Sequence, residues 1–208
     1  MLTSSNACRR WLTTNPPNIE RALLSIERIT RAANTARDVV NHIRVLSRQP
    51  AETRDLTALA GLVEDARDLM VDEASRYSAQ MELEVEADLP RVAVDRIQIR
   101  QVLINLIRNG LEAMEFVARS RILRLSVGRS DDTVQIAVSD RGIGLEFPDK
   151  IFEPFFTTKF QGMGMGLAIC RTIADAHGGR LFAKQNEPHG TTFVFALPFE
   201  PASLARSV

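Results

Sequence analysis

Two asparagines stand one helical turn apart inside an apolar stretch of the chain. Asn105 and Asn109 have the i, i+4 spacing that places two side chains on one face of a helix, and Leu and Ile residues surround them. A buried amide needs hydrogen-bond partners, so one interpretation is a pair of satisfied core amides. The other is a metal site, because amide oxygens suit Mg²⁺, which also keeps phosphate and water oxygens in its shell.

A carboxylate followed by two glycines ends a predicted strand. Asp140 lies just beyond the predicted strand over residues 133–138, and Gly142 and Gly144 let the backbone turn sharply after it. Such a carboxylate accepts hydrogen bonds, for example from the exocyclic amine of adenine. A turn with positive-φ glycines is the alternative explanation.

Further along, an aromatic segment precedes a glycine-rich one. Three phenylalanines lie within residues 152–156, in a connection that is otherwise polar, and we expect a segment that packs down in one state and lifts in another. A loop pinned permanently to the core is the alternative. Residues 162–166 have a G-x-G-x-G spacing and open a helix, where free amides and the helix dipole favour phosphate. The spacing fits neither a P-loop nor a Rossmann fingerprint.

A last glycine element, residues 190–192, enters the final predicted strand, where a hydroxyl can line a base pocket. In this order, the motifs resemble those of the sensor histidine kinases of two-component systems, in the GHKL or Bergerat ATP-binding superfamily. The matching segments are the N box (105–112), the G1 box (140–144), the F box (152–156), the G2 box (162–166) and the last glycine element (190–192). The resemblance covers nearly the whole chain.

The resemblance implies a binding site for ATP and Mg²⁺. Asn109, with Asn105, would hold Mg²⁺ on the triphosphate. Asp140 would bind the adenine amino group, helped by Thr192 through water, while Gly142 and Gly144 let the backbone pass the base.

The same resemblance implies a mobile lid over residues 145–163. Phe152 and Phe155 would anchor this lid, and the phosphates would lie against the start of the following helix, at Gly164, Gly166 and Leu167. Lys159 is a candidate for a charge contact with them, and a solvated lysine is its alternative.

The reaction follows from one position. Hydrolase relatives of the fold carry a glutamate four residues before the magnesium asparagine, as a general base for water. Asn105 occupies that position here, which favours transfer of the γ-phosphoryl to another nucleophile, and hence a kinase.

The family's nucleophile is a histidine on the first hairpin helix, followed by an acidic residue and a proline. His42, His177 and His189 lack that setting, and the first residues resemble a helix that begins past the phosphoacceptor. We therefore expect Mg-ATP binding without self-phosphorylation, and activity in trans on a histidine of another chain. The alternatives are a non-catalytic dimerising module that binds ATP or a response regulator and modulates an intact kinase, and a serine kinase of the anti-sigma type, against which the long hairpin helix argues.

The elements that must position these residues follow from periodicity. Apolar residues at helical spacing predict helices over 2–14, 19–47, 59–77, 95–117 and 164–177, and alternation predicts strands over 81–86, 91–94, 122–127, 133–138, 180–184 and 191–197. We expect an α+β fold: a partial helical dimerisation hairpin (1–48), a linker (49–57), an α/β sandwich whose mixed sheet is covered on one face by helices (58–200), and a tail (201–208).

Composition sets the remaining expectations. The chain has 208 residues and zero formal charge, but residues 1–60 hold 9 basic and 5 acidic side chains and the rest 17 and 21. No basic field points to nucleic acid, and no apolar stretch is long enough for a membrane span. Cys8 and Cys170 form no metal-spaced pair. We therefore predict a cytoplasmic protein that forms a homodimer through residues 1–48 and contacts a response regulator receiver domain.

Overall fold

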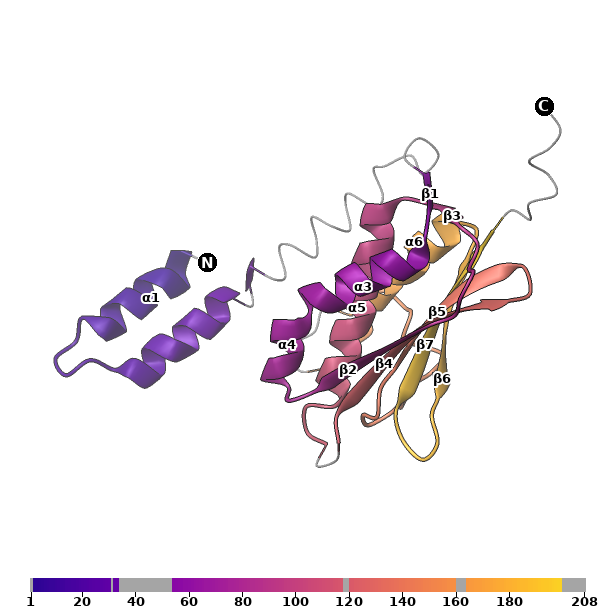
Figure 1. Ribbon diagram of the computed structural model, residues 1–208. Coiled ribbons are helices and arrows are strands. Elements are labelled where there is room, and N and C mark those ends of the chain that lie inside the picture. Colours follow the sequence, from indigo (N-terminus) through magenta and orange to yellow (C-terminus); the bar gives the residue numbers. More distant parts are fainter. Residues whose placement is uncertain (1, 31, 34–53, 118–119, 160–163, 200–208) are drawn as a thin grey trace. The chain divides into compact units, whose positions relative to one another are not determined.

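The computed structural model describes residues 2–30, 32–33, 54–117, 120–159 and 164–199. They belong to two units, which we describe separately: residues 1–48 with 157–163, and residues 49–156 with 164–208 (Figure 1). Of the predicted long helix over 19–47, the part beyond residue 33 lies outside the described residues, as do most of the linker and the tail. None of the helices in the described ranges is long and apolar enough to cross a lipid bilayer.

The first unit is a helical hairpin. Helix α1 (Leu2–Leu12) is followed by a turn and by a second helix over residues 19–30 and 32–33. Asn18 begins the second helix, because its side-chain oxygen accepts the Arg21 amide at 3.0 Å. The Arg21 guanidinium lies over the Trp11 ring at 4.6 Å, which joins the two helices.

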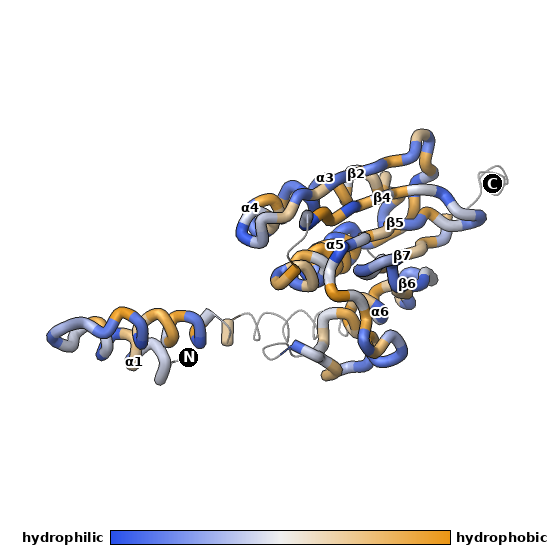
Figure 2. The backbone as a smooth tube through the Cα atoms, turned by 90° about the horizontal axis from the view of Figure 1, so that it is seen from below, coloured by the Kyte–Doolittle hydropathy of each residue, from blue (hydrophilic) through white to orange (hydrophobic). Residues whose placement is uncertain are grey.

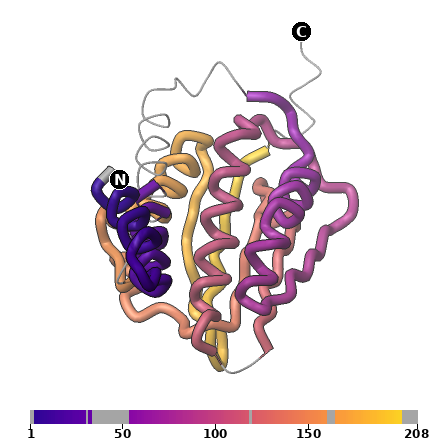
Figure 3. Tube along the Cα trace, turned by 90° about the vertical axis from the view of Figure 1, so that its left-hand side faces the viewer, coloured from indigo at the N-terminus to yellow at the C-terminus, as the bar shows by residue number. Residues whose placement is uncertain are grey.

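A five-stranded mixed sheet forms the second unit, with the order β2-β4-β5-β7-β6. Its strands are β2 (Gln80–Val85), β4 (Ile122–Ser130), β5 (Thr133–Ser139), β6 (Arg180–Gln185) and β7 (Thr191–Pro198). β2 pairs with β4 in parallel, and the other neighbours are antiparallel. Helices α3 (Leu59–Leu69), α5 (Arg96–Ala113) and α6 (Gly166–Ala176) cover one face of the sheet (Figures 1 and 3). The expected α+β fold is therefore confirmed.

Helix α5 is the central helix of this layer. Asp95 begins it, because its Oδ1 accepts the Ile97 amide at 2.9 Å. The apolar face of α5 is buried against the sheet. Along the helices and strands, stretches of hydrophobic and hydrophilic residues follow one another (Figure 2). Side chains of α5 and the sheet with no exposed surface make this core: Leu103, Leu106, Ile107, Leu111, Leu123, Leu125, Ile136 and Phe195.

A second, two-stranded sheet departs from expectation. Residues 55–57, which fall in the predicted linker, form β1 (Asp55–Thr57) and pair antiparallel with β3 (Val92–Val94). The sequence Asp-Leu-Thr is too short and too polar to indicate a strand without its distant partner.

The predicted helix over 59–77 is divided in two. Met70 separates α3 from α4 (Val71–Arg76) with a φ of −102° and a ψ of 3°. Met70 is buried, while Leu69 and Val71 are 61% and 49% exposed. Of these three consecutive apolar residues, only the one at the interruption is therefore part of the core.

Candidate functional site

Asp140 lies at the end of β5, next to the start of β7. Its side chain is buried, and Oδ1 accepts the backbone amides of Gly142 at 2.7 Å and Thr191 at 3.2 Å. Its own amide donates to the Thr191 carbonyl at 2.9 Å. The register that pairs Ser139 with Thr192 produces this arrangement, because it brings both strand ends to the same edge. The carboxylate is thus held in one orientation by backbone donors.

The loop after Asp140 packs closely on the end of α5. A Cβ on Gly142 would lie 2.5 Å from the Ala113 carbonyl oxygen, so no larger residue fits there without displacement. The Ile143 amide donates to the same carbonyl at 3.3 Å. Gly144 has a φ of +82°, and Leu145 after it donates to Gln185 Oε1 at 2.9 Å. The two predicted glycines therefore serve a tight, fixed turn.

The turn of α5 that carries the two asparagines approaches both Asp140 and the start of α6. A Cβ on Gly110, directly after Asn109, would clash with the Leu123 side chain and would be in van der Waals contact, at 3.5 Å, with the Asp140 Cβ. At the other asparagine, a Cβ on Gly166 would lie 4.0 Å from Cγ of Asn105. One turn of α5 therefore connects the Asp140 region to the first residue of α6.

Asn105 has a defined orientation. Its Nδ2 donates to the Cys170 sulfur at 3.7 Å, and this sulfur lies 4.0 Å from the Val102 carbonyl. Burial raises the pKa of the Cys170 thiol to about 12, so the sulfur is a neutral thiol. With the nitrogen committed to Cys170, the oxygen of Asn105 is the atom left to bind a cation. The alternative interpretation, a satisfied core amide, therefore holds for the nitrogen of Asn105.

Helix α6 begins at Gly166, two residues later than predicted. No side chain caps it, and its first turn, which includes Leu167, contains no acidic residue. Gly164 has a φ of +67°, and its Cβ would lie 2.2 Å from the Phe156 carbonyl oxygen. Gly164 therefore provides a close backbone approach to the aromatic segment, while the first α6 amides lie beside Asn105. Gly162 is outside the described residues.

Phe152 and Phe155 differ in their surroundings. The Phe152 ring meets Phe193 of β7 edge to face at 6.5 Å, and the Arg171 guanidinium lies 5.2 Å from it. Phe155 is 75% exposed and has a φ of +67°, so the structure does not place it as an anchor. Phe156 packs instead, against Phe147 at 5.8 Å. Of the two adjacent rings, Phe156 is therefore half-buried and Phe155 faces solvent.

Thr192 lies in a polar network that sequence reasoning missed. Its Oγ1 lies 2.7 Å from Asn186 Oδ1 and 2.8 Å from Ser139 Oγ. Asn186 Nδ2 donates to Ser139 Oγ and to the Asp140 carbonyl, both at 3.0 Å. These residues come together through strand pairing, and Asn186 lies in no recognised sequence motif, so the sequence did not indicate it. Lys159 belongs to the segment described with the first unit, and its expected phosphate contact stays a prediction.

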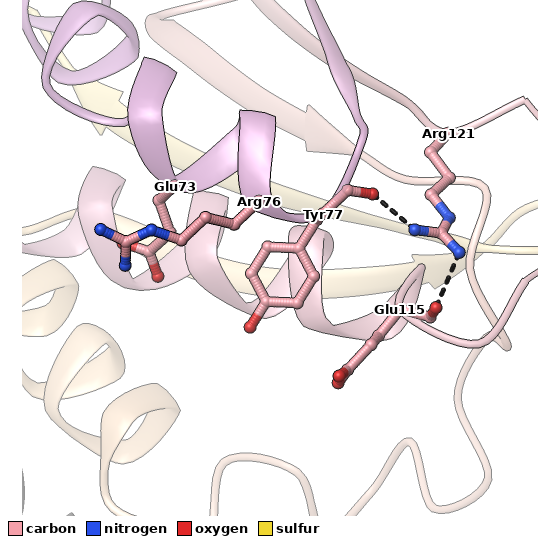
Figure 4. A pocket seen from close by; sticks show the side chains of 5 residues that line it. All are labelled: Glu73, Arg76, Tyr77, Glu115 and Arg121. Carbon is pink, nitrogen blue, oxygen red and sulfur yellow. Dashed lines mark hydrogen bonds between the residues drawn. The ribbon is translucent and has the colours of Figure 1, made fainter. Parts of the chain in front are cut away.

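A pocket of about 270 Å³ lies elsewhere, at the C-terminal ends of α4 and α5. It is lined by Glu73, Arg76, Tyr77, Glu115 and Arg121 (Figure 4). The Arg121 guanidinium donates to the carbonyls of Tyr77 and Glu115, and burial, followed by the neighbouring glutamates, raises the pKa of the Tyr77 phenol. None of the predicted site residues lines this pocket, and we assign it no function.

The fold and this site define an ATP-binding domain of the Bergerat type, and comparison with known proteins agrees. Residues 94–201 match the family described as histidine kinase-, DNA gyrase B-, and HSP90-like ATPases. The chain is 36% identical to the sensor protein FixL of Bradyrhizobium diazoefficiens over 187 residues, which cover 88% of this chain and 36% of FixL. It is 32% identical to the sensor histidine kinase TmoS of Ectopseudomonas mendocina, covering 95% of this chain and 21% of TmoS.

Solved structures show the same relationship. The catalytic domain of histidine kinase ThkA, in a nucleotide-free form, is 33% identical, with a TM-score of 0.62 and coverage of 70% of this chain and 95% of that domain. A complex of ThkA with the response regulator protein TrrA superposes over 97% of this chain and 58% of the ThkA chain with a TM-score of 0.71, at 23% identity, and shows the fold alone.

The chain belongs to the family of histidine kinase-, DNA gyrase B-, and HSP90-like ATPases. Within it, the second unit is the ATP-binding catalytic domain of the sensor histidine kinase kind, as predicted from the boxes. The chain spans between about a fifth and a third of the length of the two curated relatives named above.

Proposed function

We propose that this chain binds ATP with Mg²⁺ and transfers the γ-phosphoryl group to a histidine supplied by another chain. The proposal rests on the approach of helix α5 to two neighbours: Gly110 lies against Asp140, and Asn105, one helical turn before Asn109, lies against Gly166 at the start of α6. A base, a metal and a phosphate tail need their sites in this order, and α5 supplies the spacing between them.

Asp140 would accept the adenine amino group, since its carboxylate is held by two backbone amides and is buried. Gly142 and Gly144 would let the backbone pass close to the base. Thr191 of β7 lies opposite Asp140 and donates its amide to the carboxylate, whereas Thr192, the predicted partner of the base, pairs with Ser139. Desolvation at this edge strengthens such hydrogen bonds and leaves a mismatched group unpaired.

Mg²⁺ would be bound by the asparagine side chains of α5. The amide oxygens of Asn105 and Asn109 are hard ligands, which Mg²⁺ prefers. Among the described residues, no group of three or more His, Cys, Asp or Glu side chains could hold a metal ion. Mg²⁺ would complete its shell with phosphate and water oxygens and would neutralise charge on the phosphates. The backbone amides at Gly166 and Leu167 would hold phosphate oxygens at the start of α6.

The acceptor histidine comes from elsewhere in this proposal. His177 is buried, with Nδ1 2.8 Å from the Ile173 carbonyl and Nε2 accepting the Asp95 amide at 3.1 Å, so both ring nitrogens are engaged. His189 is exposed and lies in the β6–β7 connection, and His42 is outside the described residues.

The first unit would provide the dimer contact and the surface for a receiver domain. Four of its apolar side chains are between 46% and 56% exposed: Ile19, Leu23, Leu24 and Ile26. A second copy would bury them. ThkA is seen with a response regulator, which supports the same type of partner here.

Two measurements test the proposal. The first is titration of the full chain with ADP and Mg²⁺: Asp140→Asn should weaken binding at least tenfold, because the amide nitrogen cannot accept the base amine, whereas Asp131→Asn, in the exposed β4–β5 turn, should not. Equal affinity in both variants would refute the site.

The second measurement incubates the chain with labelled ATP and a separate histidine-bearing dimerisation hairpin. Acid-labile, base-stable phosphate on the hairpin, and none on this chain, is the expected result. Nucleotide binding without transfer to any hairpin would favour the non-catalytic module instead.

A further inference from the structure

Gln185 is the last residue of β6, and its side chain reaches the turn that follows Asp140. Across the sheet, Gln185 pairs with Thr191, and the Thr191 carbonyl in turn accepts the Asp140 amide at 2.9 Å. The side chains of directly opposed residues point to the same face of a sheet. Gln185 therefore lies on the face that carries the Asp140 carboxylate.

The Leu145 amide fixes the orientation of the Gln185 side chain. This N–H can only donate, and it lies 2.9 Å from Oε1, so Gln185 contributes its oxygen and its nitrogen faces the other way. That nitrogen lies against Gly144, because a Cβ on Gly144 would collide with Nε2. The glycine, with a φ of +82°, therefore also leaves the space that the Gln185 amide occupies.

The turn is held at both ends by side chains of the sheet. At its start, the Gly142 amide donates to Asp140 Oδ1 at 2.7 Å. At its end, the Leu145 amide donates to Gln185, which is exposed on the edge strand. Leu145 is also the first residue of the predicted lid. The fixed part of the chain therefore extends from Asp140 to the residue at which that lid would begin.

We propose that Gln185 is a positioning residue for the nucleotide, because by accepting the Leu145 amide it keeps the turn after Asp140 in the conformation that receives the base. The inference rests on the proposed ATP site. A loop that must be ordered at the moment of binding costs part of the affinity, and a loop that is already ordered avoids this cost. Without the Gln185 oxygen, ADP would have to order the end of the turn itself.

The test compares ADP affinity, with Mg²⁺ and salt at about 0.15 M, between the full chain and variants of matched length. Gln185→Met keeps the length of the side chain and removes the acceptor, so ADP affinity should fall about three- to tenfold. Gln185→Glu keeps an acceptor and should retain the affinity within about twofold. Lys184→Met is the matched control and should leave the affinity unchanged, because Lys184 is exposed on β6 and points to the opposite face of the sheet.

Hydrogen exchange of two backbone amides, followed by NMR, shows whether the effect is local. Exchange of the Leu145 amide should be about tenfold faster in Gln185→Met than in the unmodified chain, and should be slow again in Gln185→Glu. The Gly142 amide should keep its rate, because Asp140 still accepts it. Equally accelerated exchange of both amides would mean that the variant loosens the whole sheet edge, and would overturn the inference.

The outcomes separate this inference from the proposed function. If the unmodified chain binds no ADP, the proposed function fails, and this inference with it. If it binds ADP and Gln185→Met retains the same affinity, only this inference is overturned. An equal loss of affinity in Gln185→Glu and Gln185→Met would also overturn it, because the acceptor would then have no part in binding. Should Gln185→Met not fold, Gln185→Ala, which likewise lacks an acceptor, gives the same comparison.

Discussion

Lowering the pH should destabilise the second unit through His177. This ring connects two helix ends: Nδ1 donates to the Ile173 carbonyl in the last turn of α6, and Nε2 accepts the amide of Asp95, the N-cap of α5. Protonation would place a hydrogen on Nε2 and set it against the Asp95 amide. Burial, mainly, and the charge of Arg54 lower the pKa of His177 below its ordinary 6.5, against the smaller opposing effects of the Ile173 carbonyl and the Asp95 carboxylate.

The sign of the effect follows from linkage. The unfolded chain takes up the proton near pH 6.5 and the folded chain only at a lower pH, so the contribution is fully present above 6.5 and is lost as the pH falls below it. The slope approaches about 1.4 kcal/mol per pH unit until the folded-state pKa is reached. At pH 5.5 the loss is therefore at most about 1.4 kcal/mol, or tenfold in the folding equilibrium.

Urea unfolding followed by circular dichroism at pH 7.5, 6.5 and 5.5 measures this loss. Trp11 lies in the first unit, so tryptophan fluorescence would not report on α5 and α6. His177→Gln should remove this part of the pH dependence, and His189→Gln, at an exposed position, should keep it. Parallel pH dependence in the unmodified chain and His177→Gln, or a His177 ring that titrates above 6.5 by NMR, would refute the reasoning.

Three further predictions concern residues of the site. Gly142→Ala should push the loop off the Ala113 carbonyl, cost about 1–3 kcal/mol of stability, and weaken ADP binding, which calorimetry and urea unfolding would show; unchanged values would mean that the turn is not tightly packed. Phe152→Ala should cost about 1–2 kcal/mol from its ring and guanidinium contacts, whereas Phe155→Ala, at a 75% exposed ring, should stay within about 0.5 kcal/mol; the reverse order would show that Phe155 is the anchor. With a pKa of about 12 and no exposed surface, Cys170 should not react with a thiol reagent at pH 8 until urea unfolds the chain, and rapid modification of the folded chain, located by mass spectrometry, would argue against its burial.

The sequence predicted the fold well where periodicity was strong and local. Helix α5 and strands β4, β5 and β7 lie within a few residues of their expected positions, because their apolar residues repeat with one unambiguous period. The failures have long-range causes. β1 forms only by pairing with β3, some forty residues away. Met70 interrupts the predicted helix between two further apolar residues, so the apolar pattern does not show the break.

The site shows the same division. Asp140, Asn105 and the glycines could be selected as candidates because each lies in a short sequence motif. Asn186 could not, since its hydrogen bonds with Asp140 and Thr192 depend on the pairing of β7 with β5 and with β6. Phe155 and Phe156 are adjacent and chemically identical, so the sequence could not show that Phe155, with its positive φ, is exposed while Phe156 packs against Phe147.

The connection between β6 and β7 bears on how this chain can be engineered. Glu187, Pro188 and His189 are exposed, and such a loop would ordinarily be chosen for an epitope tag or an inserted reporter domain. Yet both ends of the loop are fastened to Asp140, through Asn186 on one side and Gly190 and Thr191 on the other. An insertion there would disturb the backbone around Asp140, where we propose that adenine binds, so solvent exposure is a poor guide to tolerance at this point of the molecule.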